Sequence, residues 1–159
     1  MKFSAVEEYG IRCLLRIAKF YHVEKSLTIP EISSAEGISQ HIAGKILRSL
    51  RLGGFLESSR GQIGGYTLSR PPEEIKIKDV ISILGGKLYD DSFCKEHKGI
   101  SDLCTNSIDC SVRSLWRIIQ DAIDAAIDKM TLKDLLVSEN LLFESFNQPV
   151  KAEEEKQPA

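Results

Sequence analysis

Apolar residues recur every three or four positions through much of the first half of the chain, which is the spacing of one face of an α-helix. The first such stripe predicts a helix over 4–20. The next predicted helix begins at Thr28, because Thr28 and Glu31 stand at the two positions of a capping box. It ends near Gly37, since glycine readily terminates a helix. The pattern therefore opens with a longer helix followed by a short one.

A third helix, Ser39–Leu52, is predicted directly after the second, with a pair of glycines at its end. Its apolar positions are Ile42, Ile46, Leu47 and Leu50. Two short helices joined by so few residues are typical of a helix-turn-helix. Two short alternating runs, 55–60 and 66–70, then flank a glycine-rich turn and predict a β-hairpin. A helix-turn-helix followed by such a hairpin is a winged helix.

The second half of the chain has a different pattern. A short helix is predicted over Ile77–Leu84, whereas 88–109 has no helical period and is interpreted as a loop. The longest predicted helix, Ser111–Met130, has more apolar surface than one small domain buries, which indicates a partner subunit. A final short helix is expected from Thr131 to Val137. The residues expected to form the dimer interface are Leu115, Ile119, Ile123 and Ile127.

These elements predict a mainly α fold with three parts and a tail. A winged helix-turn-helix domain with a two-stranded β wing spans 1–76, and a short helix with the cysteine-containing loop spans 77–110. A long dimerisation helix and a short C-terminal helix span 111–138. The segment 144–159 is rich in charged residues and is expected to be a disordered tail.

Composition adds an expected compartment and a charge asymmetry. With 42% hydrophobic and 28% charged residues, the chain has the composition of a globular protein. It has no apolar run of about 18 residues and no apolar signal segment at its start, so we expect a cytoplasmic protein without a membrane span. Residues 1–72 contain ten Lys and Arg against six Asp and Glu, whereas 73–159 contain eleven against seventeen. A basic N-terminal half favours binding to nucleic acid.

The third predicted helix has polar side chains of the kinds that contact DNA. In a helix-turn-helix the second helix enters the major groove, with its N-terminal residues nearest the bases. Such side chains read base edges or contact phosphates, although on an isolated helix they are also typical of a solvated face. The winged-helix context favours double-stranded DNA as the partner. The predicted contacts are Ser39, Gln40, His41, Lys45 and Arg48 from the helix, and Arg60 and Gln62 from the tip of the wing.

The four cysteines divide into one and three. Cys13 lies on the apolar stripe of the first helix and is interpreted as a buried structural thiol. Cys94, Cys104 and Cys110 share one polar loop, with nine and five residues between them. This arrangement favours an iron–sulfur cluster, because cluster ligands are spread over several iron atoms and tolerate wide loops. Redox-active thiols, a structural zinc ion and no role at all remain open alternatives.

The chain resembles the Rrf-two family of bacterial winged-helix regulators that hold an iron–sulfur cluster. The resemblance runs from Met1 to Val137. Its most specific piece is RGQIGGYTL, which is similar to the family's wing motif RG-x-x-GGY. It also includes the segments MKFSAVEEYGIRCLLRIA, ISSAEGISQHIAGKILRSLRLGGFLESSRGQIGGYTLSR, IKIKDVISIL, SVRSLWRII and TLKDLL, together with the three-cysteine loop.

The resemblance implies a symmetric dimer held by the long helix, with a cluster on the three loop cysteines near that interface. The first gap between the cysteines is longer than in one branch of the family. Arg113 also replaces the histidine ligand that this branch has three positions after the last cysteine. Another branch implies that Glu8 is the fourth ligand, contributed by the partner subunit. Glu7 and His97 are the next candidates.

Together these features predict a transcriptional repressor whose affinity for operator DNA is controlled by an iron–sulfur cluster of two or four irons. The cluster would sense iron, redox state or nitric oxide. The alternatives are a cluster-free regulator with a thiol switch and, ranked lower, an iron–sulfur or zinc protein without DNA binding. An oxidoreductase is disfavoured, because no nucleotide-binding glycine-rich turn joins a strand to a helix. We therefore expect no enzymatic activity.

Overall fold

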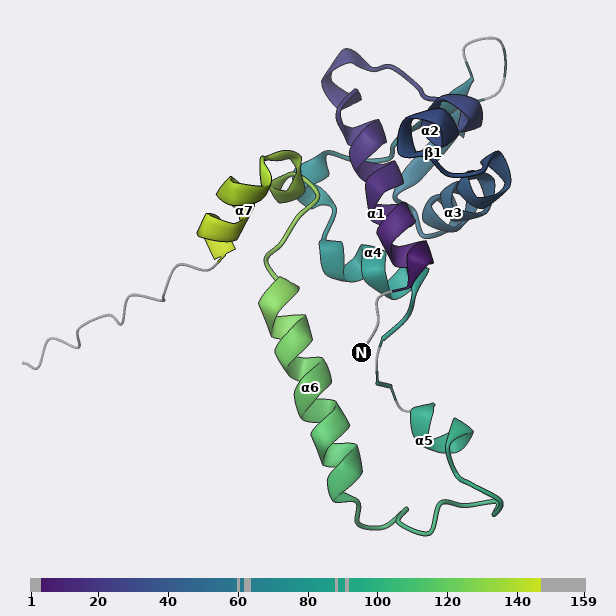
Figure 1. Ribbon diagram of the computed structural model, residues 1–159, viewed down its shortest axis with the longest axis vertical. Helices are drawn as coiled ribbons and strands as arrows, with labels where there is room; N and C mark the ends of the chain where they lie inside the picture. Colours follow the sequence, from purple (N-terminus) through teal and green to yellow (C-terminus); the bar gives the residue numbers. More distant parts are fainter. Residues whose placement is uncertain (1–3, 60, 62–63, 88, 91, 147–159) are drawn as a thin grey trace, which may run out of the picture.

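The N-terminal part of the computed structural model is a group of packed helices with a two-stranded antiparallel sheet (Figure 1). The structure describes residues 4–59, 61, 64–87, 89–90 and 92–146. The elements of this part are α1 (Ala5–Ala18), the 3-10 helix η1 (Tyr21–Val23), α2 (Ile29–Glu36), α3 (Gln40–Leu52), β1 (Leu56–Ser59), β2 (Gly65–Leu68), the 3-10 helix η2 (Pro72–Glu74) and α4 (Ile77–Leu84). Two short helices followed by a hairpin confirm the predicted winged-helix fold.

Hydrogen bonds at the helix starts explain why the first two helices begin where the sequence predicts. Ser4 caps α1: its hydroxyl oxygen accepts the N–H of Glu7, and the Glu7 carboxylate accepts the N–H of Ser4. Thr28 and Glu31 form the same reciprocal pair at the start of α2. Gly37 ends α2 with a φ of 66°, a left-handed conformation that glycine adopts without strain.

The core lies where α1 and α3 pack against each other, against α2 and α4, and against the hairpin. Its largest fully buried side chains are Leu14, Ile17, Ile32, Leu47, Leu50, Phe55, Ile75, Val80 and Leu132. On α3 the buried stripe begins at Ala43, whereas Ile42 is 40% exposed. The prediction that Ile42 belongs to this stripe was wrong, because the spacing of three and four residues is already complete from Ala43 onward.

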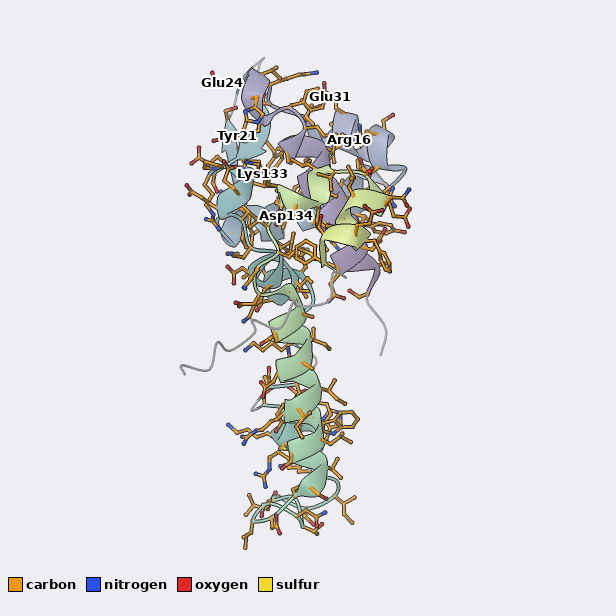
Figure 2. The ribbon with its side chains drawn as sticks, turned by 90° about the vertical axis from the view of Figure 1, so that its left-hand side faces the viewer. Arg16, Tyr21, Glu24, Glu31, Lys133 and Asp134 are labelled. Carbon is orange, nitrogen blue, oxygen red and sulfur yellow. The ribbon has the colours of Figure 1, made fainter. Side chains whose placement is uncertain are left out.

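The rest of the described chain extends away from this body and returns to it at its C-terminal end. Its elements are α5 (Phe93–Glu96), α6 (Ser111–Ile127), the 3-10 helix η3 (Asp134–Leu136) and α7 (Glu139–Phe146). Figure 1 shows α6 running away from the winged helix, with α5 and its loop beside the far end of α6. Figure 2, turned by 90°, shows the same protruding helix from the side.

The prediction of an unbroken loop over 88–109 was wrong at α5. The Asp90 carboxylate accepts the backbone N–H groups of Ser92 at 2.7 Å and Phe93 at 3.2 Å. Side chains of this kind satisfy the free amides at a helix start. One helical turn is thereby stabilised without an apolar period that the sequence pattern could reveal.

The C-terminal elements also differ in part from the expectation. The long helix ends at Ile127, three residues before the predicted end. The expected short helix after Thr131 is present as η3. The prediction of disorder was wrong for 144–146, which complete the last turn of α7, and the remainder of that segment lies outside the described residues.

The C-terminal end of α6 is fixed to the winged helix. Leu132 is fully buried, and its N–H donates to the carbonyl of Ile75 at 2.8 Å. Lys78 on α4 places Nζ 3.3 Å from Oδ1 of Asp128, just after α6. The N-terminal end of the same helix follows Cys110 and the cysteine loop, so α6 joins the two regions. Within the described ranges, no helix is both long enough and apolar enough to cross a bilayer.

Candidate nucleic-acid interface and cysteine site

The exposed face of α3 presents a row of polar side chains. His41, Lys45 and Arg48 are all exposed, and their spacing of four and three residues places them on one side of the helix, away from the buried stripe. Gln40 and Ser39 are exposed at the N-terminal end of the helix. The structure therefore leaves all five predicted helix contacts accessible on or next to this face.

Two further residues extend this face and were missed from the sequence. Arg51 is exposed in the last turn of α3, and Leu52 is 69% exposed four residues after Arg48. The spacing of four residues from Arg48 is the signal in the sequence that could have placed Leu52 on this face. Leu52 was missed because an apolar residue on a helix is ordinarily expected to face the core.

The wing is attached to the segment before α2. In the hairpin Ser59 pairs with Gly65, and the neighbouring residue of β2 bridges to Leu27. A side-chain carbon at Gly65 would lie 2.8 Å from the carbonyl oxygen of Leu27, so this close approach requires glycine. The predicted contacts Arg60 and Gln62 at the tip of the wing lie outside the described residues.

Two arginines of α1 hold the end of α2 in place, an arrangement that the sequence reasoning missed. The Glu36 side chain is only 9% exposed, with Nε of Arg16 2.7 Å from one carboxylate oxygen and Nε of Arg12 3.1 Å from the other. Arg12 also donates from Nη2 to the Glu36 carbonyl at 2.6 Å. Because Glu36 is the last residue of α2, these bonds fix the turn that leads into α3.

The structure brings the three loop cysteines to one pocket. Cys94, Cys104 and Cys110 line a cavity of about 400 Å³, and all three are half-buried and free. The charged side chains that line the same cavity are Lys95, Lys98 and Arg113, with Asp102 as the one acid among them. Cationic side chains attract negatively charged groups, so this lining suits an anionic ligand such as a thiolate-bound cluster.

Neighbouring elements orient two of these sulfurs. The Tyr89 hydroxyl lies 3.7 Å from Sγ of Cys94, and this hydrogen bond raises the pKa of Tyr89. The backbone N–H of Tyr89 donates to Oε1 of Gln120 at 3.1 Å, which connects the start of the cysteine segment to α6. Cys110 caps α6, since its sulfur accepts the N–H of Arg113 at 3.3 Å.

Cys13 has the buried position that the sequence indicates. Its side chain is fully buried in the winged-helix core, and burial raises the pKa of this thiol to about 11. A thiol with so high a pKa is protonated at neutral pH and is a poor nucleophile and metal ligand. Cys13 is therefore chemically distinct from the three cysteines of the pocket.

The pocket gathers thiols without arranging them as a closed metal site. In the part of the chain that the structure describes, no three His, Cys, Asp or Glu side chains have the geometry of a metal-binding group. The donor set still suits an iron–sulfur cluster, because thiolates are the ligands that these clusters prefer. A cluster would require the segment around the cavity to contract.

The two acidic candidates for a fourth ligand lie elsewhere in this chain. Glu8 is exposed in the first turn of α1, with Oε1 4.0 Å from Nη1 of Arg12, and is not among the residues lining the cysteine pocket. The Glu7 carboxylate accepts the N–H of Ser4 at 2.6 Å and lines a different cavity between α1, α4 and α6. A contribution of Glu8 therefore depends on a partner subunit.

His97 lies with the cysteines. It lines a second cavity, of about 220 Å³, together with all three cysteine side chains of the first cavity. Its Nδ1 is 2.9 Å from the carbonyl oxygen of Phe93, and its ring stacks on the Phe93 ring with a centroid distance of 4.0 Å. Of the three candidates for a fourth ligand, His97 alone shares a cavity with the thiols of its own chain.

The predicted dimer residues lie on the long helix with differing exposure. Leu115 is 50% exposed, whereas Ile119, Ile123 and Ile127 are half-buried. Ile123 and Ile127 also line the cavity between α6 and α4 of the same chain. Gln120 is the one buried residue of α6, so this helix leaves much apolar surface uncovered.

Comparison with protein families and sequences matches this chain to transcriptional regulators. The Rrf2 family, described as an iron-dependent transcriptional regulator, matches residues 3–138. Protein rrf2 of Nitratidesulfovibrio vulgaris is 31% identical over 136 residues, which cover 86% of this chain and 87% of that protein. The transcriptional regulator CymR of Bacillus subtilis is 29% identical over 85% of this chain and 89% of its own length.

Solved structures of two such regulators match the same span. IscR of T. potens has a TM-score of 0.66 and 27% identity, covering 86% of both chains. CymR of Staphylococcus aureus in an oxidized form has a TM-score of 0.65 and 27% identity, covering 87% of this chain and 98% of the other. The likeness therefore extends well beyond the winged helix.

Proposed function

We propose, from the premise that this chain belongs to the Rrf2 family of transcriptional regulators, that it represses transcription by binding operator DNA as a cytoplasmic homodimer. We further propose that its operator affinity is controlled by an iron–sulfur cluster on Cys94, Cys104 and Cys110. The observation that carries the cluster is the convergence of these three thiols on one cavity, whose charged lining residues are mainly cationic.

The DNA contacts follow from the exposed face of α3. With this helix in the major groove, His41, Lys45 and Arg48 face bases and phosphates along one line, and Gln40 lies at the end nearest the bases. Arg60 and Gln62 of the wing are proposed to contact the neighbouring groove or backbone. The bonds from Arg12 and Arg16 to Glu36 hold the turn before α3, so they set the angle at which the helix meets DNA.

The dimer is proposed to form through α6. Its exposed apolar residues have no covering element within the described chain, and a second copy of the same helix would cover them. The exposed members of this surface are Val112, Leu115, Trp116 and Ile118. A two-fold pair of winged helices would then read the two half-sites of a palindromic operator.

The chemistry that a bound cluster supplies is a redox-active, exchangeable iron centre held by thiolates. The protein's part is to couple that centre to the dimer and to DNA. The cysteine segment is bonded to α6 through Tyr89 and Gln120, and α6 is bonded to the winged helix near Lys78 and Leu132. Contraction of the segment would therefore change how α6 is held, and with α6 the winged helix. This change would bias an equilibrium between two arrangements of the winged helix.

The direct test is a titration of operator DNA from upstream of the chain's own gene with holo and apo protein under anaerobic conditions. We expect their affinities to differ tenfold or more, which is about 1.4 kcal/mol of coupling. An absorbance spectrum with iron and sulfide counts establishes the cluster first. Equal affinities of the holo and apo protein would contradict control by the cluster.

The DNA contacts are tested separately on the apo and holo protein. Arg48→Ala and Lys45→Ala should each weaken operator binding. If the lost contact is to a base, the loss should be about 1–3 kcal/mol; if it is to a phosphate, the slope of log affinity against log salt concentration should fall by about one. Lys129→Ala, at an exposed position beyond α6, is the matched control and should leave the affinity unchanged. Wild-type affinity in both Arg48→Ala and Lys45→Ala would contradict the placement of α3 in the groove.

A cluster-free thiol switch is the second candidate function. It is favoured by the three free, half-buried thiols, by their lack of metal-site geometry within the described residues, and by the similar CymR that was solved in an oxidized form. Peroxide treatment of metal-free protein, followed by mass spectrometry and operator titration, distinguishes the two. Disulfide formation that changes operator affinity without iron would favour the thiol switch.

A further inference from the structure

We infer that His97 is the fourth cluster ligand and binds through Nε2 from the same chain as the three cysteines. This inference rests on the proposed cluster function and deepens it, because it makes the ligand set Cys94, His97, Cys104 and Cys110. Each subunit then holds its cluster without a ligand from its partner.

The placement of His97 carries the first part of the argument. Cys94 and His97 stand three residues apart on and directly after α5, so one helical turn brings both side chains to the same side. The cavity of about 220 Å³ is lined by these two residues together with Cys104 and Cys110. Three sulfur donors and one imidazole therefore line one cavity, and these side chains would have to move closer together to bind a metal.

The hydrogen bond of the imidazole carries the second part. A carbonyl oxygen only accepts hydrogen bonds, so the 2.9 Å contact with Phe93 requires Nδ1 of His97 to carry the hydrogen. The lone pair of the neutral ring is then on Nε2. Metal-ligating histidines have this arrangement, in which the second nitrogen donates to a carbonyl or carboxylate and fixes the ring.

Stacked aromatic rings hold the imidazole in this orientation. The rings of His97 and Phe93 are 15° from parallel, and the Phe93 ring also contacts those of Tyr89 and Trp116 at centroid distances of 5.5 and 6.4 Å. Capping of α5 by the imidazole explains its Nδ1 bond.

The other candidates fit less well. Arg113 donates from Nη2 to the Ser107 carbonyl at 2.9 Å, and a guanidinium has no lone pair to offer a metal. Asp102 lines only the larger cavity. Glu8 lies on α1 next to Arg12 and would have to come from the partner subunit.

The test is pulsed electron paramagnetic resonance of the reduced cluster in protein labelled with ¹⁵N-histidine. The chain has three histidines, so His22→Gln and His41→Gln are matched controls. We expect a strongly coupled histidine nitrogen in the wild type and in both controls, and its loss in His97→Ala. The cluster of His97→Ala should be lost in air at least tenfold faster, whereas that of Glu8→Ala should be lost at the wild-type rate.

A rescue variant separates ligation from a structural role. His97→Cys should restore the cluster lifetime and lower the reduction potential, because a thiolate replaces a neutral imidazole. No coupled histidine nitrogen, together with a wild-type lifetime in His97→Ala, would overturn the inference and leave the proposed function standing. Faster loss in Glu8→Ala alone would assign the position to the carboxylate instead. No cluster after anaerobic reconstitution, or zinc bound without sulfide, would overturn both.

Discussion

The winged helix and the cysteine segment 89–110 differ in what holds each of them in place. The winged helix encloses a continuous core in which residues such as Leu47 and Leu50 are fully buried. In the cysteine segment Ile100 and Ile108 are fully exposed, and Tyr89 is its one buried hydrophobic residue among those described. Burial of apolar surface determines the first region, whereas the second is held mainly by hydrogen bonds such as those of Asp90 and Gln120.

The largest expected effect is the loss of the cluster from single cysteine variants. Cys94→Ala, Cys104→Ala and Cys110→Ala should each abolish cluster absorption after anaerobic reconstitution, because each removes a thiolate from the pocket. Cys13→Ala should keep the cluster and lose about 1 kcal/mol of unfolding free energy, since it only removes a small buried group. Iron and sulfide counts and urea titration measure the two quantities. Loss of the cluster in Cys13→Ala would contradict the assignment of the cluster to the cysteine segment alone.

A pair of leucine truncations compares the two regions directly. Leu47→Ala should lower the unfolding free energy by about 2–5 kcal/mol, because Leu47 is fully buried and its truncation leaves a cavity. Leu103→Ala, at a side chain that is 75% exposed in the cysteine segment, should change it by less than about 0.5 kcal/mol. Both are measured by urea unfolding of apo protein. A large loss in Leu103→Ala would mean that the cysteine segment has a core of its own.

The long helix that joins the regions is tested by a charge at its exposed face. Leu115→Glu should shift the wild-type dimer toward monomer by about 2 kcal/mol or more, because a carboxylate would be buried without a partner. Val23→Glu, at a side chain 69% exposed on η1, is the matched control and should stay dimeric. Sedimentation velocity at micromolar concentration decides. A dimeric Leu115→Glu protein would place the interface elsewhere.

The same contrast explains how far the sequence predicts this molecule. The bounds of α1 to α4 were predictable to within a residue or two because their signals are local: a capping side chain, a terminating glycine and an apolar spacing. α5 was not, since one turn held by Asp90 has no apolar period, and α7 was likewise missed.

The candidate sites were predictable as residue types more than as arrangements. Spacing alone placed His41, Lys45 and Arg48 on one helix face, and the three loop cysteines were the natural metal candidates. The convergence of His97 with those cysteines depends on the turn of α5 and on the packing of Phe93, which no local signal encodes. The bonds to Glu36 likewise required the crossing of α1 and α2.

The smallest expected effect concerns one local device that both regions share. Glu31 at the start of α2 and Asp90 before α5 are exposed carboxylates that accept local hydrogen bonds. The bonds from the N–H and hydroxyl of Thr28 lower the pKa of Glu31, and those from the hydroxyl and N–H of Ser92 lower the pKa of Asp90. A lowered pKa contributes stability above the ordinary pKa, and this stability is lost as the pH falls through the lowered value.

α2 packs into the core through Ile32, so Glu31→Gln should lower the unfolding free energy measurably at pH 7 and progressively less toward acid. α5 has no buried residue, so Asp90→Asn should leave global unfolding unchanged and only speed hydrogen exchange at Phe93–Glu96. Urea titrations from pH 3 to 7 and exchange mass spectrometry separate the two outcomes. A global loss in Asp90→Asn would show that the cysteine segment folds together with the winged helix, which would remove the difference between the regions.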